Sequence, residues 1–179
     1  VCTNATRDLC SIMLADSGHI HEGDVKWFNK RRVAKGLDPV EPIYTEKEAR
    51  ACMEVFIGVA YNRKFNIDEN IQVRFTNTGH MLGSSVVSLE IKENGKTYKI
   101  GYTGDIGRPS NRILKSPEPF PQCDYLITES TYGNRLHPQM QEAEGELLRI
   151  LTKTCVEKKG KQIIPSFAIG RTQEIVYSL

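Results

Sequence analysis

The sequence predicts a layered α/β fold, and three observations along its 179 residues lead to that class. The first third carries apolar residues at helical spacing, and the middle third changes to a period of two. The last third alternates strand-like and helix-like segments. Helices and strands in this order are typical of layered α/β architecture. The length is that of one domain or of parts of two.

Three helices are expected first, over residues 7–15, 21–36 and 46–57. The third begins with a capping box, in which Thr45 and Glu48 satisfy each other's backbone N–H groups. The second carries five cations: Lys26, Lys30, Arg31, Arg32 and Lys35. A solvated helix face is the simpler interpretation of this cluster, and an RNA-phosphate patch is the other.

Strands are expected next, over residues 71–78, 86–93 and 96–103. The last two flank Asn94 and Gly95, a dipeptide typical of the tight turn in a β-hairpin. We therefore expect a run of antiparallel strands in the middle of the chain.

The last third is expected to add a strand over 124–129, a helix over 140–160, a buried strand over 161–167 and a helix from residue 170. The apolar stripe of the first of these helices comprises Ala143, Leu147, Ile150, Leu151 and Thr154. Strand, helix, strand and helix in succession indicate a second α/β unit.

Composition narrows the class of protein. Hydrophobic residues make up 39% and charged residues 26%, as in a soluble globular protein. The formal charge of +2 is too small to indicate nucleic-acid binding by itself. No apolar run approaches the roughly 20 residues of a membrane span, and no secretory signal opens the chain. The five cysteines are widely spaced, which favours a reducing cytosol. Because the chain starts with Val1, we expect a piece of a longer protein.

Polar residues recur where the predicted strands end. His80 and Asp105 follow the first and third strands, and Glu129 ends the strand over 124–129. Strand ends present side chains rigidly, and a histidine with two acids suits a metal-hydrolase centre. Taken singly, His80 can be a polar turn residue and Asp105 the side chain of an Asx turn.

A second histidine pair, His19 and His21, precedes Asp24 in "HIHEGD". It lies between two predicted helices and not at a strand end. We therefore expect it to have a surface or capping role, away from Asp105.

Four segments in order, "TGHMLGSSVV", "YTGDIGRP", "LITESTYGNRLH" and "IPSFAIGRTQE", resemble the β-CASP branch of the metallo-β-lactamase superfamily, the RNA- and DNA-cleaving nucleases. The resemblance implies that His80 is a zinc ligand and that Asp105 bridges two zinc ions. It implies that Glu129 is an acidic residue beside the metals that partners a later histidine. Candidate contacts to phosphate are Ser84, Ser85, Ser130 and Arg171.

The resemblance also implies a division of the chain. Residues 1–133 match the later part of a metallo-β-lactamase αββα sandwich, and residues 134–179 match the opening of the β-CASP cassette. The H-x-H-x-D-H motif of the family is expected upstream of "TNATRDL". With two ligands only, the chain alone is expected to hold zinc weakly or not at all and to be inactive.

The implied activity of the full-length protein is zinc-dependent hydrolysis of phosphodiester bonds in RNA or DNA, by endo- or exonuclease action. Expected partners are nucleic acid, and either a second copy or the missing N-terminal segment. Two alternatives stay open: a non-catalytic scaffold subunit of the same fold, and a hydrolase of a small ester or thioester.

Overall fold

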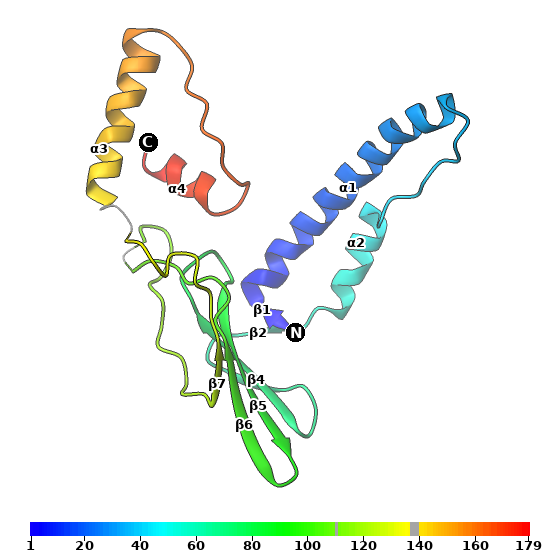
Figure 1. Ribbon diagram of the computed structural model, residues 1–179, viewed down its shortest axis with the longest axis vertical. Helices are drawn as coiled ribbons and strands as arrows, with labels where there is room; N and C mark the ends of the chain where they lie inside the picture. The colour runs from blue at the N-terminus through cyan, green and yellow to red at the C-terminus, as the bar shows by residue number, and fades with distance from the viewer. Residues whose placement is uncertain (110, 137–139) are drawn as a thin grey trace.

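The polypeptide forms a mixed α/β structure in which two pairs of helices diverge from one end of a central sheet (Figure 1). The computed structural model describes residues 1–109, 111–136 and 140–179. Within these ranges, no helix combines the length and the apolarity that crossing a bilayer requires.

The first helix, α1 (Asn4–Ala34), is continuous over 31 residues, so the prediction of two helices was wrong. Gly18 has low intrinsic helix propensity, which suggested a break. Its missing side chain instead allows close packing, because a Cβ atom there would lie 2.8 Å from the backbone N of Glu46. Contact with a second helix thus outweighs local propensity.

The second helix, α2 (Glu46–Cys52), lies along α1 and confirms the predicted capping box. Thr45 Oγ1 accepts a hydrogen bond from the backbone N–H of Glu48 at 3.2 Å. Glu48 Oε2 accepts one from the backbone N–H of Thr45 at 2.8 Å. The α-helix ends earlier than predicted, because the chain tightens into the 3₁₀ turn η1 (Met53–Val55).

The central sheet confirms the predicted strands. Its five members, in spatial order, are β3 (Lys64–Asn66), β4 (Ile71–Asn77), β5 (Ser85–Glu93), β6 (Lys96–Tyr102) and β7 (Tyr125–Ile127). Neighbours pair antiparallel except β6 and β7, which are parallel. The hairpin turn has φ angles of 51° at Asn94 and 72° at Gly95, the positive values of a type I′ turn.

A small parallel pair, β1 (Cys2–Thr3) with β2 (Gly58–Val59), joins the start of α1 to the sheet. The core beneath it contains Val59, Val73 and Phe75, with Tyr61, Phe65, Val87 and Leu89 partly buried against them. The period-two pattern of β4 therefore places its apolar residues against the segment that follows α2.

The C-terminal part contains α3 (Met140–Leu151), the π-helical turn η2 (Thr152–Glu157) and α4 (Arg171–Tyr177). The predicted stripe is half-buried at Leu147, Ile150, Leu151 and Thr154. Ala143, also on that stripe, has a side chain outside the described part of the structure.

The buried strand predicted over 161–167 is not present. Its backbone pairs with no strand in the described ranges, and Ile163 and Phe167 are 84% and 87% exposed. A strand needs a neighbour for its N–H and C=O groups, so a β-like sequence without one stays irregular.

Candidate active site

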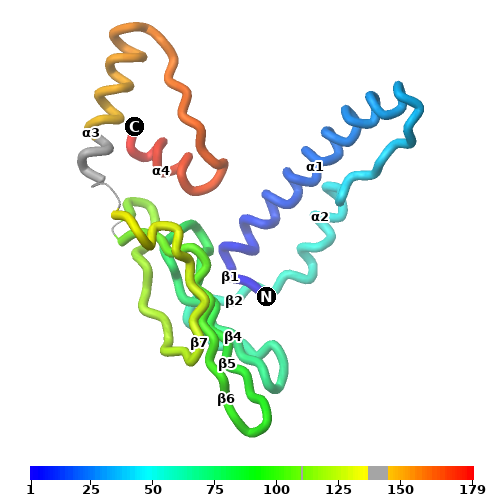
Figure 2. Tube along the Cα trace, viewed as in Figure 1, coloured from blue at the N-terminus to red at the C-terminus, as the bar shows by residue number. Residues whose placement is uncertain are grey.

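Three loops meet at one edge of the sheet. Because β4 and β6 both run antiparallel to β5, and β7 is parallel to β6, the strands β4, β6 and β7 all end at the same edge. The segments that follow them carry His80, Asp105 and Glu129. Figure 2 shows these segments turning at the end of the sheet from which the helices diverge.

The loop that carries His80 is held by one hydroxyl. Ser84 Oγ accepts hydrogen bonds from Thr78 Oγ1 at 2.8 Å and from the backbone N–H groups of His80 and Met81 at 3.1 and 3.2 Å. Sequence reasoning assigned Ser84 to phosphate and missed this role. The position of Ser84, four residues after His80 in a turn, is the signal that indicates it.

The same loop is fastened to the start of α1. The carbonyl oxygen of Gly83 accepts hydrogen bonds from Thr3 Oγ1 at 2.8 Å and from Thr6 Oγ1 at 3.1 Å. Gly83 has a φ of 88°, and a Cβ atom there would lie 2.6 Å from Thr6 Oγ1. Only glycine fits this contact without a shift of its neighbours.

The His80 and Asp105 loops cross with no side chain between them. The backbone N–H of Gly107 donates to Thr78 O at 2.8 Å, and a Cβ atom on Gly107 would lie 2.0 Å from Gly79 O. The glycine after Asp105 in "TGDIG" therefore permits the approach that brings the two loops together.

His80 and Asp105 come together as the sequence predicted. His80 Nε2 lies 3.5 Å from Asp105 Oδ2, and the side chains are 41% and 68% exposed. Two ligands of one tetrahedral zinc, each about 2.1 Å from the ion, lie about 3.4 Å apart. The spacing of this pair therefore fits a shared ion, and the pair is open to solvent.

Glu129 lies beside the pair. Its Oε1 accepts a hydrogen bond from the backbone N–H of Ile106 at 2.7 Å. That bond, a hydrogen bond from Thr131 and the nearby His80 together hold the pKa of Glu129 below its ordinary value. Glu129 is consequently a carboxylate at neutral pH, and it is tied to the loop that carries Asp105.

The described residues contain no group of three or more histidine, cysteine or acidic side chains that could hold a metal ion. His19 and His21 lie in the middle of α1 and contact the segment at the start of α2. His19 Nδ1 is 3.7 Å from Glu46 Oε2, and the ring of His21 meets the ring of Tyr44 edge-on at 5.5 Å. Their positions match the predicted surface role.

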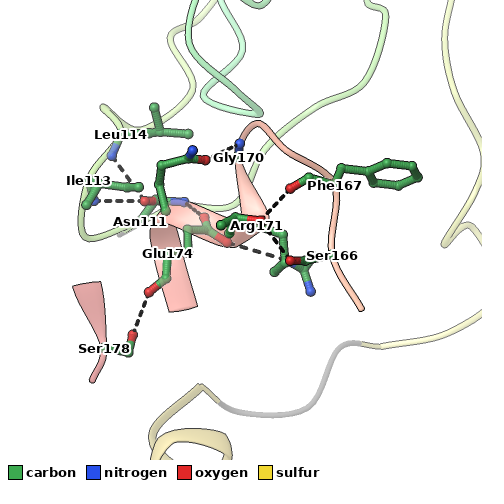
Figure 3. A network of polar contacts seen from close by, with 11 residues as sticks. Asn111, Ile113, Leu114, Ser166, Phe167, Gly170, Arg171, Glu174 and Ser178 are labelled. Atoms are coloured by element: carbon green, nitrogen blue, oxygen red, sulfur yellow. Dashed lines mark hydrogen bonds and ion pairs between the residues drawn. The ribbon is translucent and has the colours of Figure 1, made fainter. Parts of the chain in front are cut away.

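The other candidate phosphate contacts lie in defined places. Ser85 opens β5 opposite Asn77, and the carbonyl oxygen of Ser130 accepts a hydrogen bond from the N–H of Gly133 at 3.0 Å. Arg171 opens α4, where its Nε lies 3.5 Å from Glu174 Oε2 (Figure 3). Their role toward phosphate stays a prediction.

Comparison with known proteins follows from this geometry. The chain is 35% identical over 181 residues to "Transcription termination factor FttA" of Methanocaldococcus jannaschii, covering 99% of this chain and 26% of that protein. It is 41% identical over 136 residues to "RNase J-like protein" of the same organism, covering 74% of this chain and 31% of the relative. The chain belongs to the β-CASP family of the metallo-β-lactamase superfamily.

A eukaryotic β-CASP relative extends the comparison. "Cleavage and polyadenylation specificity factor subunit 3-II" of Arabidopsis thaliana is 34% identical over 146 residues, which cover 81% of this chain and 23% of the relative. No family model matches the chain. The chain spans between 23% and 31% of the length of these three β-CASP relatives.

Proposed function

We propose that the full-length protein is a metal-dependent nuclease that hydrolyses phosphodiester bonds of RNA. The observation that carries the proposal is the exposed pair of His80 and Asp105, 3.5 Å apart where three strands end. The printed names of two relatives, a ribonuclease-like protein and a cleavage and polyadenylation factor, support RNA as the substrate.

The residues of this chain fit two positions of a zinc centre. His80 would bind one ion through Nε2, and Asp105 has two carboxylate oxygens with which to serve two ions. When bound, zinc lowers the pKa of water and neutralises charge on phosphoryl oxygens. The remaining ligands are proposed to come from the H-x-H-x-D-H motif of the family.

Glu129 is proposed as a positioning residue for the proton donor to the leaving oxygen. Its carboxylate is fixed by the backbone N–H of Ile106 and faces the site as an anion. A carboxylate beside an imidazole raises the pKa of the imidazole and fixes its tautomer. This arrangement suits a histidine that acts as a general acid.

The division of the chain into residues 1–133 and 134–179 is proposed as two parts of the β-CASP architecture. The exposed side chains of β7, Tyr125, Leu126 and Ile127, support a second copy or another segment of the same protein as a neighbour. The five free cysteines support a reducing cytoplasm as the place where the protein acts.

Two substitutions in the full-length protein test the roles. Glu129→Gln is expected to lower the RNA-cleavage rate by about 10²–10⁴ and leave the zinc content unchanged, because general-acid assistance is worth that much. Asp105→Asn is expected to lose both, because it removes the carboxylate that serves both ions. Cleavage of labelled RNA and elemental analysis provide the two readouts.

Glu93→Gln is the matched control, because Glu93 ends β5 at the opposite edge of the sheet. Zinc loss in Glu129→Gln would make this residue a ligand, and no change in either readout would leave it a turn residue. Wild-type protein that binds RNA without zinc and without cleavage would favour the scaffold alternative over the nuclease.

A further inference from the structure

The distal half of α1 is strongly basic and also aromatic. We call residues 24–37 the α1 tip. It contains the five cations of the sequence cluster, Lys26, Lys30, Arg31, Arg32 and Lys35, against one acid, Asp24. It also contains Trp27 and Phe28, which are 56% and 47% exposed. A solvated helix face explains the charges but does not explain two large exposed aromatic rings among them.

These cations have no carboxylate partners. None of the five forms an ion pair in the part of the chain that the structure describes. Arg31 instead stacks on Trp27, with its guanidinium carbon 3.8 Å from the ring centroid, and Arg32 lies 5.8 Å from that of Phe28. The positive charge of the α1 tip is therefore left for an external anion.

The helix presents part of this set outward. Asn29 marks the inner side, because its side chain exchanges two hydrogen bonds with the backbone of Val40, at 2.8 and 2.9 Å. Trp27 and Arg31 are one helical turn apart on the other side, and Lys30 is three residues from Trp27. Indole, guanidinium and ammonium groups thus share one outward face.

We infer that the α1 tip binds single-stranded RNA. Unpaired bases stack on exposed aromatic rings, and cations beside those rings contact the phosphates. Arg31 covers one face of the Trp27 ring and leaves the other face for a base. An acidic protein would satisfy the charges but would leave the stacking surface unused.

The α1 tip is connected to the candidate active site. α1 begins where Thr3 and Thr6 bind Gly83 O in the His80 loop, and Trp27 lies about 35 Å further along the helix at 1.5 Å per residue. RNA held at the α1 tip would reach the site only if the strand spans this distance. The inference rests on the proposed function for the identity of the ligand.

The experiment measures binding separately from cleavage. The full-length protein is titrated, with a chelator present, against two labelled oligouridines, one too short when extended to span about 35 Å and one much longer. Trp27→Ala is expected to weaken binding of the long strand about tenfold, since stacking is worth that order of affinity. Trp27→Phe, which keeps a ring, is expected to restore most of it.

Charge is tested by the triple variant Lys30→Gln, Arg31→Gln and Lys35→Gln. The slope of log affinity against log salt for the long strand is expected to fall by about 2, at about 0.7 per lost phosphate contact. The matched control removes three exposed lysines elsewhere, by Lys47→Gln, Lys92→Gln and Lys96→Gln, and is expected to change the slope by less. Affinity for the short strand is expected to stay the same in every variant.

Equal losses in the two triple variants, or wild-type affinity in Trp27→Ala, would overturn the inference. A preference of the α1 tip for duplex RNA, or a change of oligomeric state in place of RNA affinity, would overturn it as well. Binding through the α1 tip without any cleavage would remove the proposed function and leave the inference intact. Cleavage with no effect of the tip variants would do the reverse.

Discussion

Glu129 combines a defined position with a lowered pKa, so its carboxylate couples the site to pH. The backbone N–H of Ile106 binds the ionised form, and the pKa of Glu129 in the folded protein is below its ordinary value. A depressed folded pKa contributes stability above the unfolded pKa, and this stability is lost as pH falls through the folded pKa.

We predict that Glu129→Gln removes this contribution. The free energy of unfolding of the wild-type protein should exceed that of the variant above a pH of about 4.3, the ordinary glutamate value. The difference should shrink as the pH is lowered further. Urea unfolding across this range measures it, and a gap that widens toward acid pH would contradict the assignment.

Residue-level prediction from the sequence reached the three side chains but not their contacts. His80, Asp105 and Glu129 follow strands whose period of two is plain, so their common edge was predictable. The bond from Ile106 to Glu129 and the crossing at Gly107 depend on loop conformations. Loop conformations are set by tertiary contacts, which local sequence patterns do not contain.

The elements of the fold show the same division. The hairpin at Asn94 and Gly95 and the capping box at Thr45 and Glu48 are local, and both were predicted. The continuity of α1 depends on packing against α2, and the lack of a strand over 161–167 depends on a missing neighbour. Sequence periodicity indicates what an element can form, whereas its partner decides whether it does.

Two glycines of α1 test the packing of the helix pair. Gly18→Ala would place a Cβ atom 2.8 Å from the backbone N of Glu46, so it should destabilise the protein by about 1–3 kcal/mol. Gly23→Ala meets nothing within 4 Å and should stabilise it by about 0.5–1 kcal/mol. Urea unfolding of both variants measures the difference. Stabilisation by both would mean that α2 does not pack at Gly18.

Across the whole molecule, one contact joins the two parts that the sequence predicted. Asn111 Nδ2 donates to Glu174 Oε1 in α4, and Asn111 Oδ1 accepts from the N–H groups of Ile113 and Leu114 at 2.9 and 3.0 Å (Figure 3). The loop after Asp105 is therefore tied to the helix that Arg171 opens.

A double-mutant cycle measures this link. Asn111→Ala and Glu174→Ala should show a coupling energy of about 0.5–3 kcal/mol in unfolding, the range for residues in contact. Asn111→Ala combined with Glu146→Ala is the control, because Glu146 pairs with Arg149, and its coupling should be near zero. Equal coupling in both cycles would mean that the contact does not join the two parts.

The parallel pairing of β7 has a consequence for folding kinetics. Strands β4, β5 and β6 are joined by short turns, whereas β7 reaches β6 only after the chain closes the long connection over 103–124. Loop closure of this kind is slow relative to hairpin formation. The backbone N–H of Thr103, which donates to Ile127 O at 3.0 Å, should gain protection in pulsed hydrogen exchange after the amides between β5 and β6 do. Glu129 then arrives last, so a nascent chain that has already formed its hairpins still lacks a carboxylate at the site.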